Sequence, residues 1–300
     1  EAAEALVSIK KQVADVPLVA DIHFDHQLAL KALEAGIDGL RINPGNIGGD
    51  EAVRAVATAA RQRQVPIRIG VNGGSLEQDL LERYGGATAE ALVESAMRHV
   101  VLLEAVDFYA IKIAVKASDL PRTVAAYRLL SERTQYPLHL GLTEAGTFFA
   151  GTIRSVAAMS ILLNEGIGDT LRISLTDAPE QEVRVGVELL RSLDLRARGS
   201  FVTACPTCGR TQVDIGGIAT AVENRLNIFY REHPNAPRPH VAIMGCMVNG
   251  PGEAHAADIA VAGGNGKFAV YCRGEMVGVI PETEAIERVV QMVADWWKTP

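Results

Sequence analysis

The sequence predicts an α/β protein in which a parallel (β/α) barrel is followed by a smaller α+β domain, and three observations lead to this class. Six short apolar strands alternate with helical segments along the first two thirds of the chain, a pattern typical of a parallel sheet covered by helices. No glycine-rich dinucleotide loop opens the series, which favours a closed barrel over an open doubly wound sheet. Near residue 195 the alternation stops, and short strands surround a Cys-Pro-Thr-Cys motif. We therefore expect domains over residues 1–195 and 196–300.

The elements of the barrel follow one another with short connections. Apolar runs bounded by turn residues predict strands at residues 16–23, 39–44, 66–72, 108–116, 138–144 and 170–176. Helical spacing of apolar residues predicts helices at residues 1–15, 25–35, 50–64, 76–105, 121–133, 147–165 and 179–193. A TIM barrel has eight strand–helix units, and only six strands are seen here. We therefore expect that the first two units of the barrel are missing from this sequence; a genuine six-stranded barrel is the less favoured alternative.

The second domain has a different pattern of elements. Strands are expected at residues 201–204, 240–245, 257–262, 267–272 and 276–280, and helices at residues 216–230 and 282–297. Arg273-Gly274 separates the last two strands and predicts a hairpin. The cysteine motifs fall at the ends of the first two strands, so we expect a compact α+β domain with metal ligands on its loops.

Composition limits the classes of function. The 300 residues carry a net charge of −7, which argues against a general nucleic-acid surface. No apolar run approaches the roughly 20 residues that cross a membrane, and no signal-peptide pattern opens the chain. Four cysteines, two of them in a CxxC motif, indicate a reducing compartment and metal chemistry rather than disulfides. We expect a cytoplasmic protein without nucleic-acid or membrane partners.

Three thiols and one carboxylate form a candidate metal site. Cys205 and Cys208 stand three residues apart around a proline, and Cys246 follows 38 residues after Cys208. Such spacing aims two sulfurs at one metal centre. The run 249–252, Asn-Gly-Pro-Gly, can turn closely around a bulky group, because glycine tolerates positive φ. Glu253, seven residues after Cys246, is a possible fourth ligand.

Other interpretations of the cysteines stay open. A lone CxxC motif is often a zinc knuckle or a redox dithiol. Zinc sites usually contain a second CxxC or paired histidines, and this sequence has neither, so the spacing favours an iron–sulfur centre over zinc. The remaining thiol, Cys272, lies in an alternating run that predicts a strand, and its side chain is expected to pack in the interior rather than to bind a metal.

Polar residues recur at the ends of the barrel strands. Alternate residues of a barrel strand point the same way, and four strands carry such pairs of cationic or polar residues: Arg41 with Asn43, Arg68 with Asn72, Lys112 with Lys116, and Arg172 with Ser174. Cations converging in an acidic protein repel one another unless an anion binds. A phosphate or diphosphate held by arginine forks and a lysine is the expected ligand, with Lys116 favoured over the deeper Lys112.

Two carboxylates bear on this hypothesis. Any single arginine could instead form a salt bridge with a strand-end acid, and Asp21 and Glu144 are the candidates. Glu144 also ends an apolar strand, beside Gly146. A carboxyl group at such a low-dielectric wall can act as an acid or base.

Eight motifs recur as a set in one known family. They are Asp21-Ile-His-Phe-Asp25, Arg41-Ile-Asn-Pro-Gly-Asn-Ile47, Ile67-Arg-Ile-Gly-Val-Asn72, Val115-Lys-Ala-Ser-Asp119, Gly141-Leu-Thr-Glu-Ala-Gly146, Gly166-Ile-Gly-Asp-Thr-Leu-Arg172, Ala204-Cys-Pro-Thr-Cys208 and Gly245-Cys-Met-Val-Asn-Gly-Pro-Gly-Glu253. Together they resemble the 4-hydroxy-3-methylbut-2-enyl diphosphate synthase family of the methylerythritol phosphate route to isoprenoids. The similarity is to its shorter bacterial form, without that form's N-terminal strands.

The resemblance implies a TIM barrel and a [4Fe–4S] domain in a homodimer, in which the cluster domain of one chain caps the barrel of the other. It implies the reductive opening and dehydroxylation of 2-C-methyl-D-erythritol 2,4-cyclodiphosphate, with flavodoxin or ferredoxin as electron donor. The cluster ligands would be Cys205, Cys208, Cys246 and Glu253. The diphosphate ligands would be Arg41, Asn43, Arg68, Asn72, Lys116, Arg172 and Ser174, with Glu144 as acid or base.

The residues themselves are compatible with this chemistry. Removing a hydroxyl group from a saturated carbon needs single electrons and a Lewis acid, and an iron with a displaceable carboxylate ligand offers both. One alternative is a barrel hydrolase or aldolase that acts on a phosphorylated substrate and carries a structural metal domain. A second alternative, an iron–sulfur sensor or nucleic-acid regulator, is disfavoured by the acidic charge.

Overall fold

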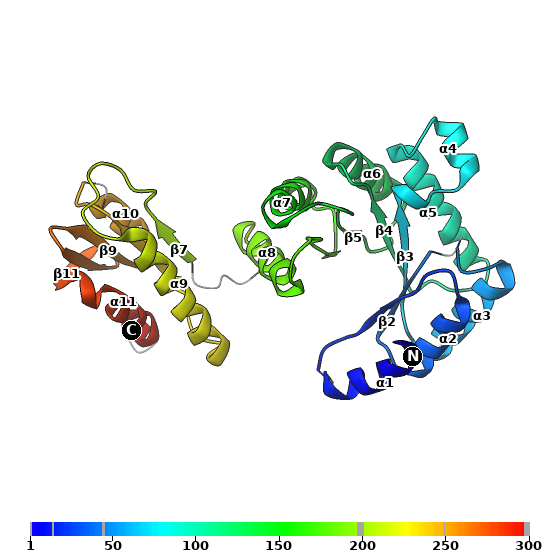
Figure 1. Ribbon diagram of the computed structural model, residues 1–300, viewed down its shortest axis with the longest axis horizontal. Coiled ribbons are helices and arrows are strands. Elements are labelled where there is room, and N and C mark those ends of the chain that lie inside the picture. Colours follow the sequence, from blue (N-terminus) through cyan, green and yellow to red (C-terminus); the bar gives the residue numbers. More distant parts are fainter. Residues whose placement is uncertain (1, 14, 44–45, 197–200, 249, 297–300) are drawn as a thin grey trace. The chain divides into compact units, whose positions relative to one another are not determined.

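The computed structural model describes residues 2–13, 15–43, 46–196, 201–248 and 250–296 (Figure 1). The chain divides into two compact units, Glu1–Leu193 and Asp194–Pro300. In the described part of the chain, no helix has the length and apolar character needed to cross a membrane.

The first unit contains two parallel sheets. Four strands pair in chain order: β1 (Val19–Asp21), β2 (Gly39–Ile42), β3 (Ile67–Asn72) and β4 (Ile111–Lys116). Two shorter strands, β5 (His139–Leu140) and β6 (Thr170–Leu171), form the second sheet. A single parallel bridge from Ile113 to Leu138 connects β4 to the β5 segment, and the Thr143 N–H donates to the Ala117 carbonyl at 3.2 Å. All six expected strands of this unit therefore form, in the expected parallel order.

Helices separate these strands along the chain. They are α1 (Ala2–Gln12), α2 (His26–Glu34), α3 (Asp50–Gln62), α4 (Gln78–Tyr84), α5 (Ala89–Glu104), α6 (Leu120–Arg133), α7 (Phe148–Asn164) and α8 (Pro179–Ser192). Side chains cap several of them: Asp25 accepts from the Gln27 N–H, Thr88 from Ala91 and Asp119 from Arg122. Such caps satisfy backbone donors that have no partner inside the helix.

Two sequence-based predictions for this unit are wrong. The single helix expected at residues 76–105 is two helices, because Gly85 and Gly86 take φ values of 68° and 138° between α4 and α5 and end the first helix. The strands expected at 138–144 and 170–176 are each only two residues long. The first cannot extend to its expected end, because Glu144 has a left-handed φ of 54°.

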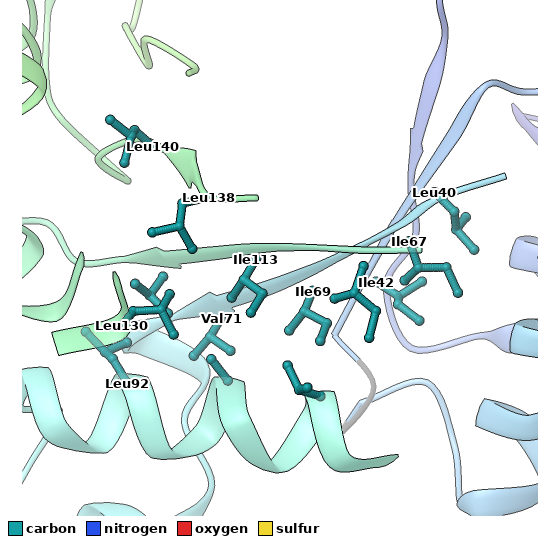
Figure 2. Close-up of a cluster of buried hydrophobic side chains, with 14 of the residues drawn as sticks. Leu40, Ile42, Ile67, Ile69, Val71, Leu92, Ile113, Leu130, Leu138 and Leu140 are labelled. Atoms are coloured by element: carbon teal, nitrogen blue, oxygen red, sulfur yellow. The ribbon is translucent and has the colours of Figure 1, made fainter. Parts of the chain in front are cut away.

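One face of the strands is apolar and packs against helices. Figure 2 shows Leu40, Ile42, Ile67, Ile69, Val71, Ile113, Leu138 and Leu140 from four strand segments, together with Leu92 of α5 and Leu130 of α6. All of these side chains are buried. Because successive side chains of a strand alternate between faces, the residues between them point to the opposite side of the sheet.

The second unit is a mixed five-stranded sheet of order β11-β10-β9-β8-β7. Its strands are β7 (Phe201–Ala204), β8 (His240–Met244), β9 (Ile259–Gly264), β10 (Lys267–Cys272) and β11 (Glu275–Pro281). The first three strands pair in parallel, and β10 pairs antiparallel with both β9 and β11. Helices α9 (Ile215–Glu232) and α11 (Ala285–Asp295) bury their apolar faces in one core.

The segment after Cys246 differs from the expected turn. Helix α10 (Gly250–Ala256) begins within the run 249–252 and contains Glu253 in its first turn. Asn249 lies outside the described residues. The terminal helix, expected from residue 282, begins at Ala285 after a 3₁₀ turn, Glu282–Glu284.

Candidate functional site

The polar face of the first unit lines a cavity of about 350 Å³. Residues from the strand ends and the segments that follow them form its wall: Asp21, His23, Arg41, Arg68, Gly70, Asn72, Ala114, Lys116, Leu142, Thr143, Glu144, Arg172 and Ser174. The structure thus brings together all but one of the residues predicted for this site. The exception is Asn43, which is buried at the end of β2 without lining the cavity.

Among the described arginine and lysine residues that line this cavity, Arg41 is the one with an acidic partner. Its Nη1 lies 2.7 Å from Asp21 Oδ1 and 3.2 Å from His23 Nε2. Its Nη2 donates to the Gly70 carbonyl at 3.1 Å. The absence of a side chain at Gly70 makes space for this guanidinium, because a Cβ at this position would lie 2.2 Å from Arg41 Nε.

Lys116 and Arg68 face the cavity without an ion pair in the described structure. Burial, followed by the charges of Arg172, Arg68 and Arg41, lowers the pKa of Lys116 to about 7. Burial likewise lowers the pKa of Arg68, and the Arg68 Nε is buried without a hydrogen-bond partner among the described residues. Like charges confined at low dielectric repel, so an anion in this cavity would be stabilised strongly.

His139 lies among the same cations. Burial and then the charges of Arg68, Lys116, Lys112 and Arg172 lower its pKa to about 2, so the imidazole is neutral. Its Nδ1 lies 2.9 Å from Thr170 Oγ1, and the Tyr127 hydroxyl donates to its carbonyl at 2.5 Å. A neutral ring adds no further repulsion to the cation cluster.

Sequence reasoning missed several wall residues. Asp21, expected only as a possible salt-bridge acid, lines the cavity around Arg41 together with His23. The parity of strand residues could have identified them. The role of Gly70 was missed because the packing of Arg41 against it is a tertiary contact.

Glu144 stands between this cavity and a second one. The second cavity, of about 310 Å³, shares Asn72, Thr143 and Glu144 with the first and is otherwise lined by Gly73, Gly74, Ser75, Ala117, Ser118 and Arg122. The φ of 54° at Glu144 is unfavourable for a non-glycine residue. Strain of this kind concentrates at functional sites.

The cysteine motifs follow two neighbouring parallel strands of the second unit. Ala204 at the end of β7 pairs in register with Ile243 of β8, and the Cys205 N–H donates to the Ile243 carbonyl at 3.1 Å. Cys246 comes two residues after β8 ends at Met244. Carboxyl ends of adjacent parallel strands lie at the same edge of a sheet, so both cysteine loops start at that edge.

The loop that carries Cys208 packs against the end of β8. A Cβ on Gly245 would lie 2.9 Å from Thr211, whose hydroxyl accepts from the Cys208 N–H at 3.1 Å. Arg210 lowers the pKa of the Cys208 thiol, first through its backbone and then through its side chain. The charge of Arg210 interacts with Cys246 as well, so one guanidinium is close to two of the predicted ligands.

The donors suit an iron–sulfur centre in type but are not gathered into one coordination sphere. Cys205, Cys208 and Cys246 are thiols, and thiolates are the usual ligands of such clusters. Among the residues that the structure describes, no three His, Cys, Asp or Glu side chains lie close enough together to hold a metal ion. Cys272 pairs with Ile259 and Glu275 at the end of β10, outside the two loops.

Comparisons with known proteins agree over both units. Residues 1–187 match the family model described as the GcpE TIM-barrel domain, and residues 201–295 match the GcpE protein C-terminal domain. A relative from Geobacter sulfurreducens is 56% identical over 292 residues, which cover 97% of this chain and 81% of the relative. Relatives from Ruminiclostridium cellulolyticum and Symbiobacterium thermophilum are 50% and 52% identical, over 98% of this chain and 82% and 77% of their own lengths. All three are named 4-hydroxy-3-methylbut-2-en-1-yl diphosphate synthase (flavodoxin).

Proposed function

This chain belongs to the GcpE family, and on that premise we propose that it reduces 2-C-methyl-D-erythritol 2,4-cyclodiphosphate to 4-hydroxy-3-methylbut-2-enyl diphosphate in isoprenoid biosynthesis. The observation that carries the proposal is the cavity in which Arg41, Arg68, Lys116 and Arg172 converge within a chain of net charge −7. Such a cluster is suited to two linked phosphoryl groups.

The cavity residues would bind and orient the diphosphate. Arg68, Lys116 and Arg172 have no ion-pair partner among the described residues and would neutralise its charges, while Asn72 and Ser174 would donate to its oxygens. Arg41, held by Asp21 and the Gly70 carbonyl, would be a preoriented fourth cation. Asn43, two residues beyond Arg41, is buried outside the wall of this cavity and is not assigned a contact with the diphosphate. Fixing the anion in this way positions the carbon skeleton for reaction.

Cys205, Cys208, Cys246 and Glu253 would hold a [4Fe–4S] cluster at the edge of the second unit's sheet. When bound, this group supplies single electrons and an iron that acts as a Lewis acid. The substrate takes up two electrons and two protons in all; one ring C–O bond and one hydroxyl C–O bond break, a C=C bond forms, and the hydroxyl leaves as water. Glu144 would hold or transfer a proton at the substrate hydroxyl.

The partners follow from the relatives. Their names specify flavodoxin, and we propose a flavodoxin as the electron donor here. We further propose a cytoplasmic homodimer in which the cluster domain of one chain closes the barrel of the other. The alternative of a hydrolase or aldolase with a structural metal is not favoured by the names of these relatives.

Anaerobic turnover tests the proposal. Protein loaded with iron and sulfide is expected to bind about four of each per chain and to convert the cyclodiphosphate to 4-hydroxy-3-methylbut-2-enyl diphosphate when reduced flavodoxin is supplied. Matched protein in which Cys205 and Cys208 are replaced by serine should lose both the iron and the turnover. A colourless zinc protein without this activity would contradict the assignment.

A further inference from the structure

The second cavity of the first unit differs in chemistry from the cationic one. Its wall carries the hydroxyl groups of Ser75, Ser118 and Thr143 and the amide of Asn72, with two glycines between them. These groups donate and accept hydrogen bonds without carrying charge. The cavity, at about 310 Å³, is far larger than the about 15 Å³ that one water requires.

Arg122, the one basic residue of this wall, is already neutralised. Its Nε donates to Asp119 Oδ2 at 2.7 Å, and its Nη2 contacts the same oxygen. Its Nη1 donates to the Ala87 carbonyl at 2.7 Å. A guanidinium held in this way contributes little to binding a second anion, so the second cavity is suited to an uncharged polar group.

The two cavities meet at Asn72, Thr143 and Glu144, which line both. The proposed substrate likewise has two halves: a charged diphosphate bridge and a hydroxylated five-carbon skeleton. If the diphosphate occupies the cationic cavity, the skeleton adjoins it, and Glu144 lies at the junction where a hydroxyl group would be protonated.

We propose that the second cavity binds the hydroxylated carbon skeleton of the cyclic diphosphate, and that Ser75 and Ser118 are determinants of specificity for its hydroxyl groups. This inference rests on the proposed function. It assigns a site to the part of the substrate that the cation cluster does not recognise.

Gly74, in the wall of the second cavity, is a position where a larger side chain can be introduced without a clash with neighbouring atoms. A Cβ built on Gly74 meets no atom within 4 Å, and its φ is not among the left-handed values. Leucine at this position would project into open space. Gly278 of β11 has the same open surroundings and lies in the other unit, so Gly278→Leu is a matched control.

The experiment measures equilibrium binding of two probes to the cluster-loaded protein, without reductant. Binding of inorganic diphosphate depends on the cationic cavity alone, whereas binding of the cyclic diphosphate depends on both cavities. Gly74→Leu should raise the dissociation constant of the cyclic diphosphate at least about thirtyfold, and Ser75→Ala/Ser118→Ala should raise it about tenfold. The dissociation constant of inorganic diphosphate should be the same for each variant as for the unaltered protein. Gly74→Ala should have a smaller effect of the same kind, and Gly278→Leu none.

Two results would overturn the inference. One is unchanged binding of the cyclic diphosphate by Gly74→Leu, which would place the skeleton elsewhere. The other is an equal loss of affinity for both probes in a variant whose unfolding temperature matches that of the unaltered protein. That result would make the second cavity part of the anion site. Failure of the proposed function is distinguishable, because the unaltered protein would then not bind the cyclic diphosphate, whether or not it bound inorganic diphosphate.

Discussion

The Arg41 guanidinium lies 2.7 Å from the Asp21 carboxylate, whereas the neighbouring Arg68 and Lys116 have no acidic partner within the described ranges. Of the two interpretations that the sequence allows for a strand-end arginine, the salt bridge therefore applies to Arg41. Burial, and after it the charges of the neighbouring arginines, lowers the pKa of Lys116, and the Asp21 carboxylate offsets this repulsion only in part. An anionic ligand would remove this repulsion.

Binding of diphosphate should therefore take up protons. Burial and neighbouring arginines lower the pKa of Lys116 from 10.5 to about 7, so in mildly alkaline solution the amine is largely neutral until an anion binds. At a pH of about 8.5, calorimetry in buffers of different ionisation enthalpy should detect uptake of nearly one proton per site. Lys116→Met should abolish that uptake, while Lys112→Met, on the same strand outside the cavity, should keep it.

The same group affects stability. Between pH 7 and its usual value of 10.5, Lys116 binds fewer protons in the folded than in the unfolded chain, so its contribution to the free energy of unfolding rises with pH across this window. Urea titrations of the ligand-free protein should show a steeper rise than titrations of Lys116→Met. Parallel pH dependences of the two proteins would contradict the lowered pKa.

Gly70→Ala should displace Arg41. The added Cβ would lie 2.2 Å from Arg41 Nε, a distance that forces the guanidinium out of its contacts with Asp21 and the Gly70 carbonyl. Loss of a preoriented cation should weaken diphosphate binding about tenfold or more. Gly278→Ala, at a strand glycine with open surroundings, is the control and should bind normally; normal binding by Gly70→Ala would disprove the steric role.

Glu144→Gln should separate binding from turnover. The amide keeps the shape of the side chain but cannot exchange a proton, so turnover should fall about 10²- to 10⁴-fold while diphosphate affinity is kept. Full activity would remove Glu144 from the mechanism. Glu165→Gln, at the surface pair with Arg128, serves as the control substitution.

The backbone strain at Glu144 gives a second test at this position. Glycine adopts a φ of 54° more readily than glutamate, so Glu144→Gly should raise the free energy of unfolding by about 1 kcal/mol and still be inactive. Gln64, with a φ of 57° after α3, provides the comparison: Gln64→Gly should gain similar stability and retain activity. A loss of stability in Glu144→Gly would show that the side chain itself supports the fold.

Glu253→Ala should keep part of the cluster and lose most of its turnover. The three thiolates retain iron, but the displaceable oxygen ligand is gone. Iron and sulfide analysis together with the electron paramagnetic resonance of the reduced protein would report the altered coordination. Cys272→Ser should leave both signals unchanged; unchanged signals and full turnover in Glu253→Ala would refute its role as a ligand.

Strand order and the apolar face could be predicted from sequence because both depend on local patterns. Alternating residues such as Ile67, Ile69 and Val71 predict one buried face, and the same alternation places Arg68 and Asn72 together on the other. The break at Gly85 could not be predicted with equal ease, since a glycine inside a helical pattern is compatible with either a kink or an end. The helix at Gly250–Ala256 contradicts the turn signal of its own glycines and proline.

The metal site illustrates a different limit. The sequence identifies Cys205, Cys208 and Cys246 as donors, and the strand pairing brings their loops to one sheet edge. It cannot show how the donors converge, because a coordination sphere is organised in large part by the metal centre itself.

The weak connection between β4 and β5 divides the walls of the cationic cavity. Arg41, Arg68 and Lys116 belong to strands of the four-stranded sheet, whereas Glu144 and Arg172 lie in the segments that follow β5 and β6. Among the described residues, the parallel pairing between the two sheets is the Ile113–Leu138 bridge. A diphosphate bound by residues on both sides would link the two sheets. Amide protons of Leu140 and Arg172 should then exchange with solvent more slowly once the ligand is bound, so substrate binding would also reduce local opening of the barrel wall.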